Sequence, residues 1–424
     1  MGVVYSLHQD VDYRQQAVFR DGVVMRCSET DYNNTRLSGL NESADPPAVV
    51  MSFRLGLDST ALLMRWITEP ASRDFALGDL ALVTAMTGHE SAATTEAMTR
   101  LVLPQLREHS IRFIQVARSR RKTTRAGEGI VVLDDSRHPR TLHAAGAFTL
   151  GDEMLSAATL PQRGGSRICS VHSKGDALDP VIARVTKGNR YRHVVGFEAN
   201  ELSRANKDRL HNTQWRTGEY PLQEWGWTRD DCRQFMLDTI GESVPKSCCG
   251  FCPFAMSTVA GRKVVIDRYR QEPHLGAEAM FLEHVARSIN PAQTLIEASS
   301  VADLVLDAGL SQVNALFERR LRDCAWSLYE VRRVVRPGKE GRAGITARSL
   351  RVLATDNRDA IAELLTSAPG VPMRGDDGIL RHVVRDRGRD RVDHLFVAAP
   401  AGAESKQRSG FEQWWQEATG DGLF

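Results

Sequence analysis

Short apolar runs alternate with amphipathic segments along the chain from Ala48 onward, whereas residues 1–45 are polar and rich in turn formers. Segments 58–67 and 92–109 repeat their apolar residues at helical spacing. The apolar runs have the length of buried strands and lie at residues 48–53, 80–86, 111–117 and 192–197. Strands that alternate with helices predict an α/β fold, in which a parallel, twisted sheet carries helices on both faces.

The same pattern divides the chain into regions. Residues 1–45 are interpreted as an N-terminal extension, and residues 46–255 as the α/β domain, with a hairpin expected near 129–135. Residues 256–424 are expected to form a mostly helical accessory domain, with one strand or hairpin near 382–400. Its clearest amphipathic helices are predicted at residues 276–289 and 310–335.

Composition and charge narrow the class of protein. With 42% hydrophobic and 25% charged residues, the 424-residue chain has an ordinary globular composition. The formal charge of +2 does not by itself predict a polyanionic partner. No apolar stretch reaches the roughly 18 to 20 residues that span a bilayer, and the first residues do not resemble a signal peptide. We therefore expect a cytoplasmic protein without a membrane partner.

The segment SFRLGLDSTALL, residues 52–63, is the most informative for chemistry, because it links a predicted strand to a predicted helix. In open parallel sheets ligands bind at the carboxyl ends of strands, where the amides of a following helix attract phosphate. Gly56 permits close approach of the backbone, and Ser59 and Thr60 add hydroxyl groups. The segment has no lysine and is therefore not a Walker A loop. An ordinary glycine turn is the alternative.

This segment resembles the pyrophosphate-binding turn, S-x-G-G-x-D-S, of the PP-loop ATP pyrophosphatases. Arg54 and Leu55 replace the usual Ser-Gly, and Ser52 stands two residues earlier than the family serine. Residues 46–255 are accordingly identified as a nucleotide-binding domain similar to the phosphoadenosine phosphosulfate (PAPS) reductases. The nucleotide-binding residues that this resemblance implies here are Ser52, Gly56, Asp58, Ser59 and Thr60.

Two later segments resemble the same family in the same order. TGHE, which begins at Thr87 and Gly88, is similar to the DTGHxxxET element, although Met86 replaces the aspartate. GFEANELSR, residues 196–204, resembles G-x-R-x-x-E-S-x-x-R, although Glu198 replaces the first arginine. A surface histidine and an ordinary capped helix are the alternatives for the two segments. The resemblance adds Thr87, Gly88, Gly196 and Glu201 to the nucleotide-binding residues, and Arg204 to the catalytic ones.

The cysteines suggest a metal site. Cys248, Cys249 and Cys252 provide three soft ligands within five positions, a spacing typical of metal ligation. Cys169 is the expected fourth ligand, because its surroundings resemble those of a cysteine in iron–sulfur members of the family. A [4Fe–4S] cluster, Zn²⁺ and no metal all remain open. Cys232 is a weaker candidate, and Cys27 and Cys324 are interpreted as structural thiols.

Two further basic features bear on the ligand. Lys174 is expected to face an anion, with a solvated lysine as the alternative. The run RSRRKTTR, residues 118–125, could contact a phosphate backbone or be an exposed loop.

The resemblance covers about half of the chain and implies binding of ATP or a related adenine nucleotide with Mg²⁺. The implied activity is adenylation that releases AMP and pyrophosphate, for sulfur transfer or for modification of a nucleotide or nucleic acid. Asp58, Lys174 and Arg204 are the implied catalytic residues, and a sulfur donor protein and a nucleotide or nucleic-acid acceptor are the implied partners. The alternatives are a PAPS or adenylylsulfate reductase, although residues 406–424 contain no cysteine, and a catalytically silent nucleotide-binding module with structural zinc.

Overall fold

The computed structural model describes residues 37–161, 168–245, 247–336, 344–386 and 392–420, and Cys27 and most of the predicted N-terminal extension lie outside these ranges. The chain divides into two compact units. Unit 1 comprises Met1–Leu150 and Ile168–Cys249, and unit 2 comprises Gly151–Arg167 and Gly250–Phe424. The chain thus enters unit 2, returns to unit 1 and leaves it again after Cys249, a path that no shift in composition reveals.

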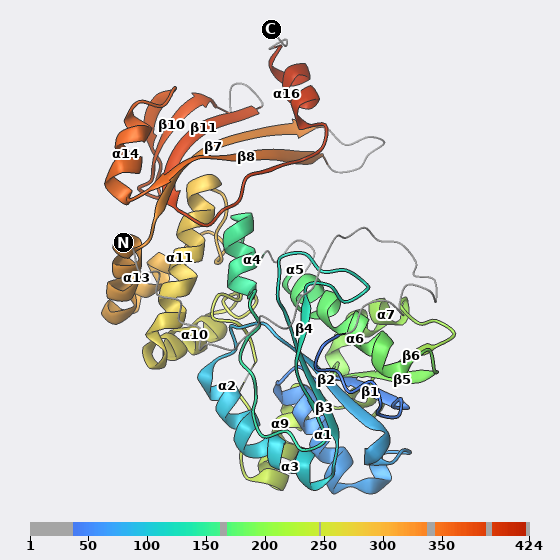
Figure 1. Ribbon diagram of the computed structural model, residues 1–424. Helices are drawn as coiled ribbons and strands as arrows, with labels where there is room; N and C mark the ends of the chain where they lie inside the picture. The colour runs from blue at the N-terminus through green and yellow to red at the C-terminus, as the bar shows by residue number, and fades with distance from the viewer. Residues whose placement is uncertain (1–36, 162–167, 246, 337–343, 387–391, 421–424) are drawn as a thin grey trace. The chain divides into compact units, whose positions relative to one another are not determined.

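Unit 1 is an α/β unit built on a mixed sheet of mostly parallel strands, with strand order β4-β3-β2-β1-β5-β6 (Figure 1). All neighbouring pairs are parallel except β3 and β4, which form an antiparallel hairpin. The expectation of a wholly parallel sheet is therefore wrong at this edge, because the connection between β3 and β4 is too short for a crossover helix. The strands are β1 (Val49–Ser52), β2 (Leu80–Met86), β3 (Arg112–Arg118), β4 (Ile130–Ser136), β5 (Tyr191–Val195) and β6 (Arg216–Glu219).

Helices cover both faces of this sheet, as predicted. Val49 and Met51 of β1 face a core shared with α1, α3 and α9, whereas Val50 faces a second core shared with α6. This alternation follows from the two-residue period of a strand. The helical elements of unit 1 are α1 (Leu57–Thr68), η3 (Pro70–Ser72), η4 (Leu77–Asp79), α2 (Ala92–Ala97), η5 (Met98–Val102), α3 (Leu103–Glu108), α5 (Ile168–Ser170), η6 (Val171–Gly175), α6 (Asp176–Thr186), η7 (Ala199–Glu201), α7 (Leu202–Arg209), α8 (Pro221–Glu224) and α9 (Arg229–Ile240).

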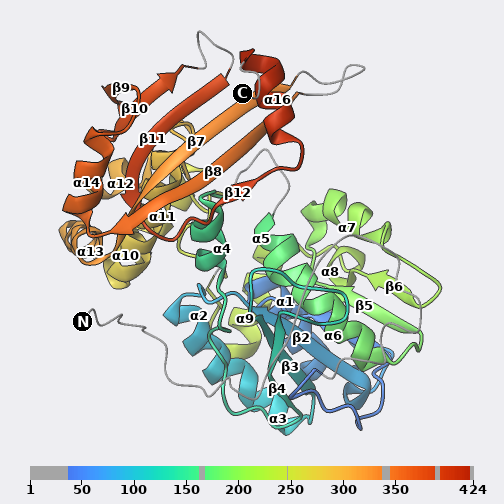
Figure 2. The same cartoon turned by 45° about the horizontal axis from the view of Figure 1, so that its top comes forward.

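Unit 2 joins a group of helices to a second sheet, whose strand order is β12-β8-β7-β11-β10-β9 (Figure 2). Every neighbouring pair in it is antiparallel. Its strands are β7 (Trp326–Arg336), β8 (Ile345–Asp356), β9 (Val371–Arg374), β10 (Leu380–Arg385), β11 (Val392–Pro400) and β12 (Lys406–Gln407). Its helices are α4 (Leu150–Ala157), α10 (Val259–Gln271), α11 (Pro273–Ile289), α12 (Val301–Asp307), α13 (Ser311–Asp323), α14 (Arg358–Thr366) and α16 (Phe411–Thr419).

The predicted helical character of residues 256–424 is correct only for their first part. The helix expected over residues 310–335 ends at Asp323, and the strand β7 begins at Trp326. Its second half is rich in aromatic and β-branched residues, which favour strands. The segment forms a strand because it pairs with β8 and with β11, which lie further along the chain. The hairpin predicted near 382–400 is confirmed as β10 and β11.

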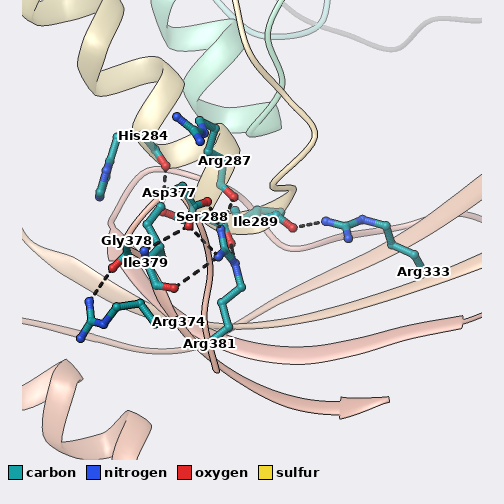
Figure 3. Close-up of polar contacts among 10 residues, drawn as sticks. All are labelled: His284, Arg287, Ser288, Ile289, Arg333, Arg374, Asp377, Gly378, Ile379 and Arg381. Carbon is teal, nitrogen blue, oxygen red and sulfur yellow. Dashed lines mark hydrogen bonds and ion pairs between the residues drawn. The ribbon is translucent and has the colours of Figure 1, made fainter. Parts of the chain in front are cut away.

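Two buried arginines join the end of α11 to the sheet of unit 2 (Figure 3). Arg381 of β10 donates from Nε to the carbonyl of Ser288 (3.1 Å) and from Nη2 to that of Arg287 (2.7 Å). Arg333 of β7 donates to the carbonyl of Ile289. These bonds satisfy helix-end carbonyls that have no partner within the helix and place positive charge at the negative end of its dipole.

None of the helices in the described part of the chain is long and apolar enough to cross a membrane.

Replacing Arg381 by Met should lower the free energy of unfolding by about 3–5 kcal/mol, because Asp377 would keep a buried, unpaired carboxylate. Arg374→Met is the matched control, since Arg374 is exposed and donates only to the carbonyl of Gly378. Chemical denaturation followed by circular dichroism measures both variants. Equal stability of the two variants would contradict this role of Arg381.

Acid should weaken unit 2 partly through His284, whose ring lies against Phe317 and Trp326. Burial lowers the pKa of His284 to about 4, so the unfolded chain binds its proton first as the pH falls. The corresponding stability is present above pH about 6.5 and is lost between pH 6.5 and 4, at up to about 1.4 kcal/mol per pH unit. Denaturation curves across this range should be less pH-dependent for His284→Gln, and an unchanged dependence would refute the assignment.

Candidate functional site

Three parallel strands of unit 1 bring the predicted site segments to one edge of the sheet. Strand β1 lies between β2 and β5, with Ser52 opposite Val83 on one side and Val195 on the other. The chain leaves β1 and β5 at this edge through residues 53–56 and 196–198, and leaves β2 through residues 87–90. Strand order reverses direction at β1, and such a switch point is where open α/β sheets bind ligands.

The turn after β1 presents the start of α1. Leu55 has a left-handed backbone (φ 56°), which glycine adopts more easily, and Leu55 stands where the resembled motif has a glycine. Gly56 is the N-cap of α1 and provides no side-chain bond to the first turn. The amides of that turn therefore lack partners within the helix and are suited to an anion. The Ser59 hydroxyl bonds to the Gly56 carbonyl (3.0 Å), while the Thr60 hydroxyl points into the core toward Met98.

Gly196, at the end of β5, packs directly against this turn. A Cβ atom on Gly196 would lie 3.2 Å from Cα and 3.3 Å from the backbone nitrogen of Ser59. These neighbours are backbone atoms, so a side chain at this position would require the backbone at the start of α1 to shift by a few tenths of an ångström. The predicted segments at 52–63 and 196–204 are thereby brought together.

Asp58 is held by an arginine that the sequence reasoning did not identify. Arg229, the first residue of α9, donates from Nε and Nη2 to the two carboxylate oxygens of Asp58 at 3.1 and 2.8 Å. The hydrogen bond to Asp58 raises the pKa of Arg229, so its charge is permanent. Arg229 thus places a cation beside the turn, which contains no lysine. No spacing rule links residues 171 positions apart.

The turn after β2 binds a carboxylate of its own. Glu90 accepts bonds from the Thr87 hydroxyl (2.6 Å) and from the backbone nitrogens of Thr87 (3.2 Å), Gly88 (3.1 Å) and His89 (3.2 Å). Successive amides that converge in this way form an anion-binding nest. The amides of Thr87 and Gly88, predicted to contact a nucleotide, are therefore engaged by Glu90.

The charged residues after β5 are also paired. Glu198 accepts bonds from the backbone (3.0 Å) and side-chain (3.1 Å) nitrogens of Asn200, and so caps the turn η7. Glu201 forms an ion pair with Arg204. The guanidinium groups of Arg204 and Arg54 lie 4.5 and 5.5 Å from the centre of the Phe197 ring.

Lys174 lies in the π-helical turn η6, a local widening of the helix that often marks functional sites. Burial lowers the pKa of Lys174, and Arg54 adds to this effect, whereas Glu90, Cys249 and Cys169 oppose it. The charge of Lys174 is thus influenced by Arg54, by Glu90 and by two of the predicted thiol ligands.

The four predicted thiol ligands are divided between the two units, with Cys169, Cys248 and Cys249 in unit 1 and Cys252 in unit 2. Within the described residues, no group of three His, Cys, Asp or Glu side chains is arranged to hold a metal ion. The six described cysteines are thiols and make no disulfide bond. Burial raises the pKa of Cys232 to about 12 and also raises that of Cys324, consistent with structural roles for both.

Comparison with known proteins adds no family. No family model, no curated protein and no solved structure matches this chain. The geometry of unit 1 is therefore the basis for assigning a function.

The basic run 118–125 begins at the end of β3 and forms the connection to β4, at the same edge of the sheet. Arg118 is buried, with its guanidinium 4.9 Å from the centre of the Phe148 ring. Arg120, Lys122 and Arg125 are exposed. The loop therefore adds positive charge to the edge that carries the turn after β1.

Gly196→Ala should destabilise unit 1 by about 1–3 kcal/mol, because the new methyl group displaces backbone at the start of α1. Gly78→Ala is a suitable control, since a Cβ there meets no atom within 4 Å. Thermal unfolding monitored by circular dichroism compares them. If both variants unfold at the same temperature, the proposed close contact is absent.

Proposed function

We propose that unit 1 is a PP-loop ATP-pyrophosphatase domain of the adenine nucleotide α-hydrolase-like fold, and that the chain adenylates a substrate with release of AMP and pyrophosphate. The observation that carries the proposal is the turn after β1. It places the uncapped first turn of α1 at the switch point of the sheet, beneath Gly196. A polyphosphate bound there would meet main-chain amides and the positive end of a helix dipole.

The charged residues at this edge suit a leaving pyrophosphate. Arg54 and Arg229 supply positive charge, which stabilises the charge that develops on the leaving group. Lys174 would add to it when the charge of a bound anion opposes the lowering of its pKa by burial. Asp58, held by both oxygens, fixes the position of Arg229 beside the first turn of α1. Mg²⁺ bound with the nucleotide would neutralise phosphate charge, and Asp58 or Glu90 would bind it at this edge only in exchange for the donors that each now engages.

The acceptor is proposed to be a nucleotide or nucleic acid. The exposed basic residues of the β3–β4 connection support this, because cationic side chains beside a site attract a phosphate backbone. A sulfur donor protein remains part of the proposal. Cys169, Cys248, Cys249 and Cys252 would hold a [4Fe–4S] cluster or Zn²⁺, supplying soft-ligand metal chemistry or structural support respectively. An anaerobic absorption spectrum with metal analysis separates these two metals.

A catalytically silent nucleotide-binding module is the second candidate. It is favoured by the engagement of Asp58 with Arg229 and of Glu90 with the amides after β2.

Incubation of α-labelled ATP and Mg²⁺ with the protein, with and without added nucleic acid, should yield AMP and pyrophosphate. Arg229→Met should lower the rate by about 100-fold, because a preorganised charge at the leaving group is lost. Arg233→Met, an exposed change on the same helix, should retain the wild-type rate. Formation of only ADP and phosphate would rule out this activity, and binding without turnover would favour the silent module.

A further inference from the structure

A chain of buried and partly buried polar side chains crosses the sheet beneath the turn after β1. The Ser52 hydroxyl lies 2.8 Å from Nε2 of His193, and Nδ1 of His193 accepts a bond from Nε of Arg216 at 2.8 Å. Arg216 also donates from Nη2 to Asp208 (2.6 Å), which accepts a second bond from the Tyr220 hydroxyl (2.8 Å). The chain therefore runs from β6 through β5 to the end of β1.

The far end of this chain is fixed in place. Burial alone would raise the pKa of Asp208, but hydrogen bonds from Arg216 and Tyr220 lower it, so Asp208 stays ionised. A side chain on Gly218 would meet the Tyr220 hydroxyl at 2.6 Å and Asp208 at 3.2 Å. The glycine thus leaves room for this ion pair, and Arg216 is held with Nε toward His193.

The arginine determines the tautomer of the histidine. A guanidinium group can only donate, so Nδ1 of His193 must carry a lone pair and the ring proton must lie on Nε2. Burial, together with the charges of Arg216 and Arg54, lowers the pKa of His193 to about 3, despite the opposing charge of Asp208. The neutral ring therefore donates to Ser52 at neutral pH.

This arrangement defines what Ser52 can do. A histidine that donates to a serine cannot take its proton, so Ser52 is not activated as a nucleophile. One lone pair of its oxygen is occupied, and of the residues that the structure describes none accepts its proton. Ser52 lies at the last position of β1, directly before the turn that leads to α1.

We infer that His193 is a positioning residue, which orients the Ser52 hydroxyl as a hydrogen-bond donor to the phosphates of the bound nucleotide. This inference rests on the proposed nucleotide site and assigns that site a specific neutral donor. Arg216, held by its ion pair with Asp208, fixes the orientation of the His193 ring through its bond to Nδ1. A phosphate oxygen without a proton can only accept hydrogen bonds at neutral pH. A hydroxyl group that donates would therefore bind it favourably.

A double-mutant cycle on ATP affinity, measured by titration calorimetry, tests the inference. Ser52→Ala should weaken binding about tenfold, as for loss of one bond to a charged group. His193→Leu should weaken binding severalfold in the wild-type background but not in the Ser52→Ala background. His193→Gln should restore most of the affinity, because its amide supplies both an acceptor for Arg216 and a donor for Ser52.

Equal losses from His193→Leu in both backgrounds would overturn the inference, because they would mark a structural role only. The ¹⁵N resonances of the His193 ring in the full-length protein provide an independent readout. A ring protonated on Nδ1 would overturn the chain of bonds itself. Wild-type protein that binds no adenine nucleotide, with Nε2 protonated as expected, would instead overturn the proposed nucleotide site and the phosphate role of Ser52.

Discussion

The end of β5 lies so close to the first turn of α1 that a Cβ atom on Gly196 would come within 3.3 Å of the backbone of Ser59. This contact at Gly196 fixes the start of α1 relative to both β1 and β5, and its neighbours are backbone atoms. The same turn carries the α1 amides and Asp58, which Arg229 binds, and Phe197 beneath Arg204 directly follows Gly196. The nucleotide site that we propose is therefore a property of backbone packing first and of side chains second.

Charge compensation is the second principle of this edge. Asp58 is paired with Arg229, Glu201 with Arg204, and Glu90 with three successive amides. Buried or half-buried charges need such partners, because desolvation is costly. A polyphosphate at this edge would have to compete with these internal carboxylates for the same donors. Its affinity would thus reflect an exchange of partners more than the number of cations present.

In unit 2, arginines connect a helix to a sheet. Arg333 and Arg381 reach from β7 and β10 to the last carbonyls of α11, and both are buried. Buried guanidinium groups are tolerated because each forms several bonds, and Arg381 also pairs with Asp377. The sequence does not indicate this connection, because a cap of this kind joins segments that lie far apart in the chain.

Much of the fold of unit 1 was readable from local pattern. The strands β1, β2, β3 and β5 and the helix α1 are confirmed near their predicted positions, because buried strands and amphipathic helices impose short periods on the sequence. The segment after Cys324 was misassigned, since aromatic and β-branched residues there fit either period until distant strands pair with them. Local periodicity identifies elements but not their partners.

The candidate site divides in the same way. By itself the sequence determined that Gly56, Thr87 and Gly196 each follow an apolar strand, and parallel strands place such residues at one edge. The tertiary structure alone decided that Arg229 holds Asp58, that Glu90 occupies the amides after β2, and that Arg216 sets the tautomer of His193. Those interactions depend on the directions and distances between residues in space. The spacing of residues along the sequence reveals neither.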